Sequence, residues 1–262
     1  MKLDPNNIDL WYVDASNFKY RDLLMLTSRW LSKTESQRLA RLKLPQHKHE
    51  FLLGRYMLRS ILSLYGSVLP QDWVFEYNKH GKPFIAKAQQ ATLKMPLYFN
   101  LSHSKGKLIL ALARYEKLGI DIECGTKPRR IKKISNRYFS RPEVESLELL
   151  PENAQQTRFY DLWSLKEAYI KACGLGLAIP LADFSYRLSN AGGISIDFSP
   201  ERQDVPEQWQ FWQIGSVPCF HVAVAVKSAH AEHLELANFF ELMPLGVLKP
   251  MPLILQRSSY PA

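Results

Sequence analysis

Hydrophobic and polar positions in the first half of the chain switch between the spacing of strands and the spacing of helices. An apolar run predicts a strand over residues 8–14, and helical spacing predicts a helix from about Lys33 and a longer one over 47–65. The longer helix has one apolar face, made of Leu53, Met57, Ile61 and Leu64. Turn residues separate further predicted strands, over residues 73–77, 97–101, 107–114 and 118–123.

The second half repeats this mixture of helices and strands. A short helix is predicted from Ser140, because serine can cap it, Pro142 suits its first turn and Glu143 completes a capping box. A long helix is predicted over residues 155–173, ending at Gly174. Strand-like segments then follow over residues 184–188, 194–198, 209–214 and 220–226.

The order of these elements divides the chain into two halves and an extension. We predict an N-terminal half over residues 1–115, a C-terminal half over 116–229 and an extension over 230–262. In the extension the pattern predicts one more helix over 230–243, followed by a segment whose four prolines exclude a continuous helix. We expect that last segment to lie over the surface.

Composition narrows the class of protein. The 262 residues are 46% hydrophobic and 23% charged, which is typical of a folded globular chain. The three cysteines lie far apart, which argues against a disulfide framework or a zinc knuckle and favours a reducing compartment. The N-terminus lacks the pattern of a secretory signal, and no apolar run approaches the roughly 18 residues that span a bilayer. We therefore expect a cytoplasmic protein without a membrane partner.

Charge adds a preference for negative partners without identifying one. The chain has 34 Lys and Arg against 25 Asp and Glu, for a net charge of +9 and a pI near 9.4. Nucleic acid, anionic membranes, phosphorylated ligands and acidic proteins all fit this balance, and so does an inert solvated surface.

Two short motifs carry candidate chemistry in the second half. In the sequence LGIDIE, strand alternation points Asp121 and Glu123 to the same face, where two carboxylates suit Mg²⁺. In FYDLWSLKEAYIKACGLG, helical spacing places Trp163, Glu167 and Lys171 on one stripe. The alternatives are ordinary salt bridges at a strand end and a surface Glu-Lys pair on a helix.

Two motifs in the first half are weaker when taken alone. The segment NKHGKPFI contains a Gly-Lys-Pro turn, in which Gly81 lets the backbone approach a ligand and Lys82 can meet a phosphate. The segment FNLSHSKG places Ser102 and His103 at the end of a predicted strand. A turn of this kind and a lone histidine after a strand are usually structural.

The order and spacing of these motifs together resemble the Sfp-type 4′-phosphopantetheinyl transferases, over roughly residues 38–176 with further similarity to about 226. The positions that carry the resemblance are Arg38, Gly81-Lys82-Pro83, Asn100-Leu101-Ser102-His103, Gly119-Ile120-Asp121-Ile122-Glu123, and Trp163-Ser164-Leu165-Lys166-Glu167 followed by Lys171. The resemblance implies an α+β fold of two similar halves related by a pseudo-twofold axis. Each half would pack helices on a small, mainly antiparallel sheet, with coenzyme A in the cleft between them.

The resemblance also implies an activity. The chain would be a holo-[acyl-carrier-protein] synthase, an enzyme that transfers the 4′-phosphopantetheine arm of coenzyme A to a serine of an acyl- or peptidyl-carrier protein and releases 3′,5′-ADP. We expect Mg²⁺ as cofactor, an acidic carrier as protein partner, no nucleic acid, and a monomer.

Roles for individual residues follow from the same resemblance. The metal ligands would be Asp121, Glu123 and Glu167. The catalytic residues would be Glu167, Lys171 and Asp121. Coenzyme A would be bound by Arg38, Arg41, Gly81, Lys82, Pro83, Asn100, Ser102, His103, Lys166 and Lys171.

Two features depart from the family pattern, and two other functions are also compatible with parts of the sequence. Glu35 stands where some relatives carry a lysine, which is a departure in the region expected to hold the phosphate. The segment after Lys227 is longer than in compact relatives. A basic nucleic-acid-binding protein would use exposed aromatic residues without a carboxylate triad in a cleft. A catalytically silent coenzyme A-binding relative would be expected to lose a metal carboxylate or the helix lysine.

Overall fold

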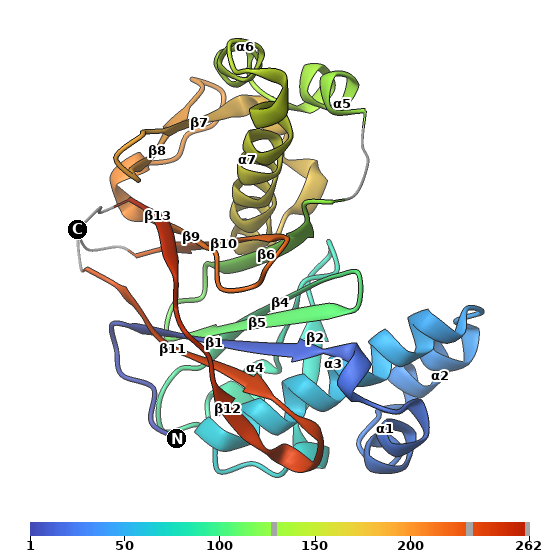
Figure 1. Ribbon diagram of the computed structural model, residues 1–262. Coiled ribbons are helices and arrows are strands. Elements are labelled where there is room, and N and C mark those ends of the chain that lie inside the picture. The colour runs from blue at the N-terminus through green and yellow to red at the C-terminus, as the bar shows by residue number, and fades with distance from the viewer. Residues whose placement is uncertain (127–129, 229–232, 260–262) are drawn as a thin grey trace.

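Two sheets stacked face to face form the centre of the molecule, and a long helix covers the outer face of each (Figure 1). The structure is a computed structural model and describes residues 1–126, 130–228 and 233–259. The layers therefore run helix, sheet, sheet, helix.

The first sheet has five strands and belongs mainly to the N-terminal half. Its order is β12 (Leu248–Pro250), β11 (Glu235–Leu242), β1 (Asn7–Asp14), β5 (Lys107–Ala113) and β4 (Tyr98–Ser104). The pairs are antiparallel except β1 with β11, which is parallel. This half also contains the hairpin of β2 (Phe75–Tyr77) with β3 (Pro83–Ile85), and the helices α1 (Tyr20–Thr27), α2 (Lys33–Arg41), α3 (Pro45–Tyr65) and α4 (Lys87–Gln90).

The second sheet has four antiparallel strands. Its order is β13 (Leu255–Ser258), β9 (Trp209–Ile214), β10 (Phe220–Lys227) and β6 (Leu118–Cys124). The same half contains the hairpin of β7 (Phe184–Leu188) with β8 (Ile194–Phe198), and the helices α5 (Ile131–Tyr138), α6 (Arg141–Glu148) and α7 (Glu152–Cys173).

The interface between the two sheets is a core of its own. Leu10 and Ala111 from the first sheet pack in one buried cluster with Ile120, Ile122 and Val224 from the second. Because the side chains of a strand alternate, the residue between Ile120 and Ile122 points the other way, toward α7. This alternation places Asp121 on the face where the helix lies.

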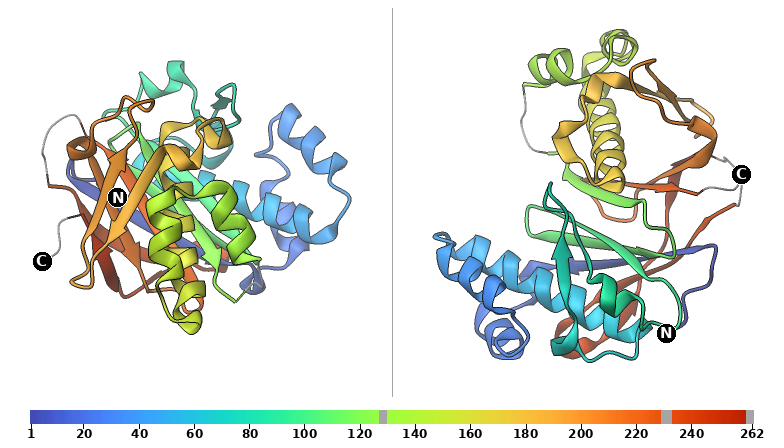
Figure 2. Two further views of the ribbon diagram at one scale, coloured as in Figure 1. Left: turned by 90° about the horizontal axis from the view of Figure 1, so that it is seen from above. Right: turned by 180° about the vertical axis from the view of Figure 1, so that it is seen from behind.

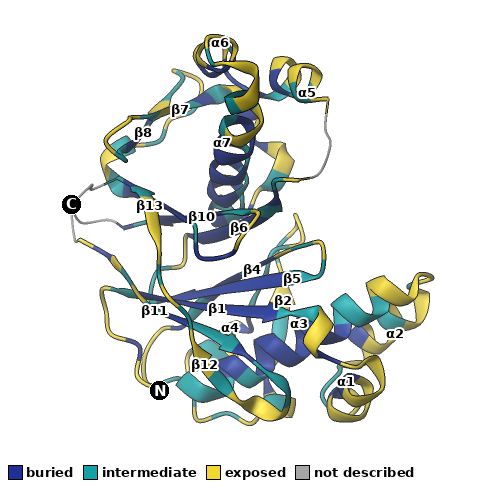
Figure 3. Ribbon diagram, viewed as in Figure 1, coloured by how far each residue is buried: buried dark blue, intermediate teal, exposed yellow. Residues whose placement is uncertain are grey.

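Each long helix is held by the apolar stripe that the sequence predicts. In α3 the buried residues Leu53, Met57 and Ile61 pack in one cluster with Trp11 and Leu110 of the first sheet. In α7 the predicted core residues Leu162, Leu165, Tyr169 and Ala172 are all buried. Figure 3 shows the part of α7 nearest its sheet in dark blue, whereas the first turns of the helix are exposed.

The fold class predicted from the sequence is confirmed, and most elements lie where they were expected. The capping box at Ser140 forms with Glu143, and Gly174 ends α7 in the left-handed conformation with φ of 71°. The sequence analysis did not identify α1, β3, α4 and α5.

The helix predicted over residues 230–243 is wrong for the part that the structure describes; residues 230–232 lie outside it. Residues 235–242 form β11, which pairs in parallel with β1, as Leu10 opposite Phe239 illustrates. The expected surface segment also supplies β12 and β13, one strand to each sheet. Pairing with β1 decides that this segment is a strand, because a short apolar pattern of this kind fits either a helix or a strand. Figure 2 shows these strands from above and from behind.

None of the helices in the described part of the chain combines the length and the apolar character that crossing a membrane requires.

Candidate active site

Polar side chains of β4 connect the facing edges of the two sheets. Strand β4 is the last strand of the first sheet and β6 the last of the second. Asn100, Ser102 and Ser104 alternate along β4 and accept hydrogen bonds from the backbone N–H groups of Ile120 (3.0 Å), Ile122 (3.3 Å) and Cys124 (3.3 Å). Three matched side-chain oxygens therefore satisfy the unpaired edge of β6 and fix the register between the halves. We call these three residues the polar ladder.

The middle residue of the ladder, Ser102, contacts a charged cluster around Asp121. The buried Asp121 carboxylate accepts a hydrogen bond from Ser102 Oγ at 2.9 Å on its Oδ1. The same oxygen forms an ion pair with Lys171 Nζ at 2.6 Å. Lys171 also donates to Ser102 Oγ at 2.7 Å. The second oxygen, Asp121 Oδ2, is shielded from solvent and has no hydrogen-bond partner. An unpaired buried carboxylate oxygen is costly, and a cation is the group that satisfies it best.

Gly119 explains why α7 approaches β6 so closely. A Cβ atom at this position would lie 2.0 Å from the carbonyl oxygen of Ala168 and 2.5 Å from the amide nitrogen of Ala172. Only glycine therefore lets the backbone of α7 rest on the strand. Lys171 lies between Ala168 and Ala172 on the helix, and Asp121 lies two residues after Gly119 on the strand. The close contact therefore brings Lys171 to Asp121.

The other two predicted metal ligands lie at the same junction. Glu123 is half-buried and accepts a hydrogen bond from Ser104 Oγ at 3.3 Å. Glu167 is half-buried on α7, one turn before Lys171. Within the described residues, no group of three or more His, Cys, Asp and Glu side chains is close enough to hold a metal as it stands. Lys171 occupies one oxygen of Asp121 instead.

Lys82 ties the hairpin of the first half to the second half. Its ammonium donates to the carbonyl oxygens of Leu118 and Ala172, both at 3.1 Å. Burial lowers the pKa of Lys82 to about 8. Gly81 forms the hairpin tip with φ of 87°, and Pro83 begins β3. The Gly-Lys-Pro turn thus locks the start of β6 to the end of α7.

The structure does not bring Lys166 to this site. The side chain has no exposed surface and forms an ion pair with Glu143 of α6 at 2.8 Å. It also donates to the carbonyl oxygens of Leu181 and Phe184, both at 2.7 Å. The expectation that Lys166 meets coenzyme A is therefore corrected: adjacent helix residues point about 100° apart, and Lys166 faces the core while Glu167 does not.

A second group of predicted residues surrounds a cavity of about 360 Å³ beside the polar ladder. Arg38 of α2 and His103 of β4 both line it. Phe51 of α3 forms one wall, with the guanidinium groups of Arg38 and Arg55 at 5.7 and 4.9 Å from its ring centroid. Arg41 is exposed at the end of α2 and does not line this cavity.

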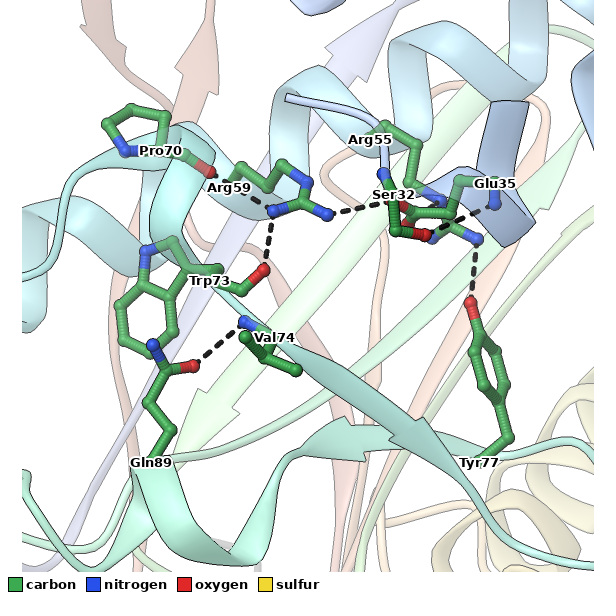
Figure 4. Close-up of polar contacts among 9 residues, drawn as sticks. All are labelled: Ser32, Glu35, Arg55, Arg59, Pro70, Trp73, Val74, Tyr77 and Gln89. Carbon is green, nitrogen blue, oxygen red and sulfur yellow. Dashed lines mark hydrogen bonds and ion pairs between the residues drawn. The ribbon is translucent and has the colours of Figure 1, made fainter. Parts of the chain in front are cut away.

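Glu35 is explained by two arginines of α3. It is buried, caps α2 through Ser32, and pairs with Arg55 Nε at 2.8 Å and Arg59 at 2.8 Å (Figure 4). Arg55 also donates to the hydroxyl of Tyr77 at 3.2 Å, which attaches the β2–β3 hairpin to α3. Glu35 is thus a structural residue at this position, and the two arginines that line the cavity are Arg38 and Arg55.

Sequence reasoning did not identify Ser104, Phe51 and Arg55 as site residues. For Ser104 a signal was available, because Asn100, Ser102 and Ser104 alternate on one face of the strand. Phe51 and Arg55 lie on an amphipathic helix, where their contact with Arg38 depends on how α2 packs. No local pattern reports that packing.

Comparisons with known proteins identify the family to which the chain is similar. Residues 117–226 match the 4′-phosphopantetheinyl transferase superfamily, and residues 19–115 match the family described as 4′-phosphopantetheinyl transferase, N-terminal. The transferase HetI of Nostoc is 34% identical over 180 residues, which cover 68% of this chain and 73% of HetI. The transferase Sfp of Bacillus subtilis is 34% identical over 168 residues, covering 64% of this chain and 71% of Sfp.

These matches define a transferase that acts with phosphopantetheine. The chain belongs to the 4′-phosphopantetheinyl transferase family. Among solved structures, the holo-[acyl-carrier-protein] synthase of Thermotoga maritima matches with a TM-score of 0.36 and 20% identity over 44% of this chain and 65% of that one. A synthase from Bacillus anthracis, solved in complex with CoA (3′,5′-ADP), matches with a TM-score of 0.34 and 24% identity over 44% of this chain and 98% of that one.

Proposed function

We propose that the enzyme transfers the 4′-phosphopantetheine arm of coenzyme A to a serine of an acyl- or peptidyl-carrier protein and releases 3′,5′-ADP. The observation that carries this proposal is the cluster of Asp121, Ser102 and Lys171 at the junction of the halves. It combines a cation for phosphate with a carboxylate oxygen that lacks a partner. Phosphoryl-type transfer needs positioning and charge neutralisation more than covalent chemistry, and this cluster offers both.

The carboxylates fit Mg²⁺ through Asp121 Oδ2, the buried oxygen without a partner. Asp121, Glu123 and Glu167 would hold the ion, which supplies Lewis-acid charge at the pyrophosphate when bound. As they stand, the described residues form no ready cluster for the ion. Ser102 donates a hydrogen bond to Asp121, and Ser104 donates one to Glu123. These hydrogen bonds orient two of the three carboxylates.

Coenzyme A would lie along the edge of β4, between the Asp121 cluster and the cavity of Arg38 and His103. Arg38 and His103 would hold the 3′-phosphate, since both line one cavity and both are exposed. Lys171 would meet the pyrophosphate, the exposed Arg41 would help from the rim of α2, and the Gly-Lys-Pro turn would close the cleft at the hairpin.

In the reaction, the hydroxyl of the carrier serine attacks the phosphorus on the pantetheine side. Glu167 takes the proton of that hydroxyl, directly or through a water. Lys171 neutralises the charge that develops on the phosphate oxygens, and the oxygen of 3′,5′-ADP leaves with the bonding pair. We propose further that the protein acts on an acidic carrier, as a monomer, in the cytoplasm.

Intact-mass measurement of a panel of apo-carriers, incubated with the enzyme, Mg²⁺ and a labelled coenzyme A analogue, tests this function directly. At least one carrier serine should gain the labelled arm, and Asp121→Asn protein that stays folded should transfer it at least about a hundredfold more slowly. A wild-type protein that binds coenzyme A but modifies no carrier would support the silent relative instead.

Lys171→Ala separates a transition-state role from simple binding. We expect turnover to fall by about two orders of magnitude while coenzyme A affinity falls much less, because one preorganised charge contributes most when charge develops. Steady-state rates and calorimetric titration of coenzyme A give the two numbers. Equal losses would make Lys171 a clamp for the ground state.

A further inference from the structure

A buried aspartate of α7 connects the helix to the strands that lie beneath it in Figure 1. The side chain of this residue, Asp161, is only 4% exposed. Its Oδ1 lies 2.8 Å from Nδ1 of His221 on β10, and its Oδ2 accepts a hydrogen bond from Arg257 on β13 at 3.0 Å. Arg257 also donates to Gln213 of β9 at 3.0 Å. The proposed transfer reaction uses none of these residues.

These contacts fix the orientation of the His221 imidazole. The ion pair with Arg257 keeps the Asp161 carboxylate an acceptor, so Nδ1 of His221 carries the proton in their hydrogen bond. The ring also stacks on Tyr160, with 5.4 Å between the centroids and 23° between the planes. A hydrogen bond at one edge and a ring on one face therefore hold the imidazole in place.

Gly125 shows where the far edge of the imidazole lies. A Cβ atom on Gly125 would be 2.6 Å from His221 Nε2 and 2.9 Å from its Cδ2, which is too close for any side chain. Gly125 directly follows β6, and its N–H donates to the carbonyl of Cys219 at 2.9 Å, which extends the pairing with β10. Residues two apart on a strand share a face. The ring therefore takes the place of a side chain next to Glu123.

Strand register leads to the same neighbour. His221 is the direct partner of Glu123 in the antiparallel pair of β10 and β6. The Cβ atoms of two such opposite residues lie about 4.5–5.5 Å apart on one face of the sheet. Toward β4, Ser104 Oγ donates to Glu123 Oε2 at 3.3 Å. Glu123 is thus flanked by a hydroxyl toward β4 and by an imidazole toward β10.

We propose that His221 is a positioning residue for Glu123, and that Asp161 and Arg257 hold His221 for this task. The imidazole closes the direction along β6 that leads away from Asp121, so fewer rotamers of Glu123 point away from the metal site. The inference rests on the metal role proposed for Glu123.

The same contacts give the C-terminal extension a part in the active site. Two residues of the extension bond to buried aspartates. Asn238 donates to Asp9 in the first sheet at 2.8 Å, and Arg257 donates to Asp161 in the second half. Only the second of these contacts leads on to His221, so the two provide a matched pair of variants.

His221→Asn tests the role of the ring. The asparagine amide keeps a donor close to the position of Nδ1, but it removes the part of the ring that lies over Gly125. We expect the affinity for Mn²⁺, measured by electron paramagnetic resonance with the metal alone, to weaken by about tenfold or more. Asp121→Asn gives the reference for loss of the site. A His221→Asn protein that binds Mn²⁺ as tightly as the wild type contradicts the proposal.

Gly125→Ala approaches the same contact from the strand. Its Cβ would displace the imidazole, so this variant should also weaken Mn²⁺ binding. In the double variant with His221→Asn the loss should be little more than in either single variant, because the ring is already gone. Fully additive losses would show that the two residues act independently, and the proposed contact would then be wrong.

The matched pair separates positioning from general stability. Arg257→Met should lower both the Tm and the affinity for Mn²⁺, and Arg257→Lys should recover part of each. Asn238→Ala should lower the Tm and leave Mn²⁺ binding unchanged. Equal losses of affinity in Arg257→Met and Asn238→Ala would overturn the inference.

Failure of this inference can be told apart from failure of the proposed function. Wild-type protein with no Mn²⁺ binding that Asp121→Asn weakens would remove the metal role of Glu123 and the positioning role of His221 together. Normal Mn²⁺ binding in all the His221 and Gly125 variants would remove the positioning role alone. Carrier modification, recorded on the same samples, reports the transferase function separately.

Discussion

A single carboxylate oxygen distinguishes Asp121 from Asp161, another buried and paired aspartate. Asp161 has both oxygens satisfied, by His221 at 2.8 Å and Arg257 at 3.0 Å, whereas Asp121 Oδ2 has no partner. The sequence could place Asp121 and Glu123 on one face, because strand alternation is a local rule. It could not show which oxygen stays unpaired, since that depends on Lys171 and Ser102 from distant elements.

Ser104 gives the first test at this scale. Ser104→Ala removes the hydroxyl that donates to Glu123 and accepts from the N–H of Cys124. We expect the Mg²⁺ concentration for half-maximal transfer to rise by about tenfold or more, as for other partners that orient metal ligands. The affinity for Mn²⁺, measured by electron paramagnetic resonance without substrates, should weaken in parallel.

Ser104→Thr keeps the hydroxyl and provides the control. Ser104→Thr should bind Mn²⁺ with about the wild-type affinity, provided that its extra methyl group fits beside the strand. If Ser104→Ala binds Mn²⁺ as the wild type does, the hydroxyl is only structural and the orienting role fails.

Among the elements, α7 shows best what a sequence pattern can and cannot report. Its apolar stripe was predicted from spacing alone, since a helix fixes which residues share a face. The family resemblance assigns Lys166 to coenzyme A, yet the side chain is buried against Glu143. Whether a lysine on the edge of a stripe faces solvent or a buried glutamate depends on how α6 packs against α7, which the periodicity of α7 does not contain.

Lys166→Ala tests this structural assignment. Removing one partner of a buried ion pair leaves the charge of Glu143 uncompensated, so we expect a loss of about 3–5 kcal/mol in the free energy of unfolding. Urea denaturation of variant and wild type measures it. The exposed pair of Arg141 and Glu145 is the control, and Arg141→Ala should cost less than about 1 kcal/mol. A Lys166→Ala protein of normal stability but lost coenzyme A binding would restore the binding role.

The junction between hairpin, β6 and α7 should respond to pH through Lys82. Burial lowers the pKa of Lys82 from 10.5 to about 8, so between these values the unfolded chain binds a proton that the folded chain does not. Stability from this group therefore rises as pH increases from about 8 to 10.5.

Lys82→Met isolates this contribution from that of other titrating groups. The stability difference, wild type minus Lys82→Met, should shift toward the wild type as the pH rises through that window. Urea denaturation at pH 8, 9 and 10 gives the difference at each pH. A constant difference would mean that Lys82 keeps an ordinary pKa in the folded protein.

At the scale of the whole molecule, the largest error of sequence reasoning concerned the C-terminal segment. Strands β11 and β12 complete the first sheet and β13 completes the second, so residues far apart in sequence share each sheet. Phe239 is buried in the core between the sheets, next to Leu10 in register. Periodicity gives the class of most local elements, but which strands pair is a matter of long-range contacts that no local window contains.

The net charge of the molecule leads to the last prediction, which rests on the proposed acidic carrier. With 34 Lys and Arg against 25 Asp and Glu, the positive field would attract such a partner over a distance set by salt. The Debye length falls from about 10 Å at 0.1 M to about 3 Å at 1 M. We therefore expect kcat/KM for the carrier to fall steeply over this range, mainly through slower encounter.

Coenzyme A is itself an anion, so its own salt dependence must be removed before the carrier effect can be read. The dissociation constant of coenzyme A, measured over the same salt series, provides that correction, and kcat/KM for the carrier should fall further than this constant rises. Exposed lysines of α5, such as Lys132 and Lys133, lie outside the cavity that Arg38 and His103 line. The double variant Lys132→Glu with Lys133→Glu should lower the affinity for the carrier and leave the affinity for coenzyme A unchanged, because only a protein partner covers that much surface. A corrected carrier efficiency that is flat in salt would mean that docking is mainly apolar, and the charge of +9 would then serve the coenzyme alone.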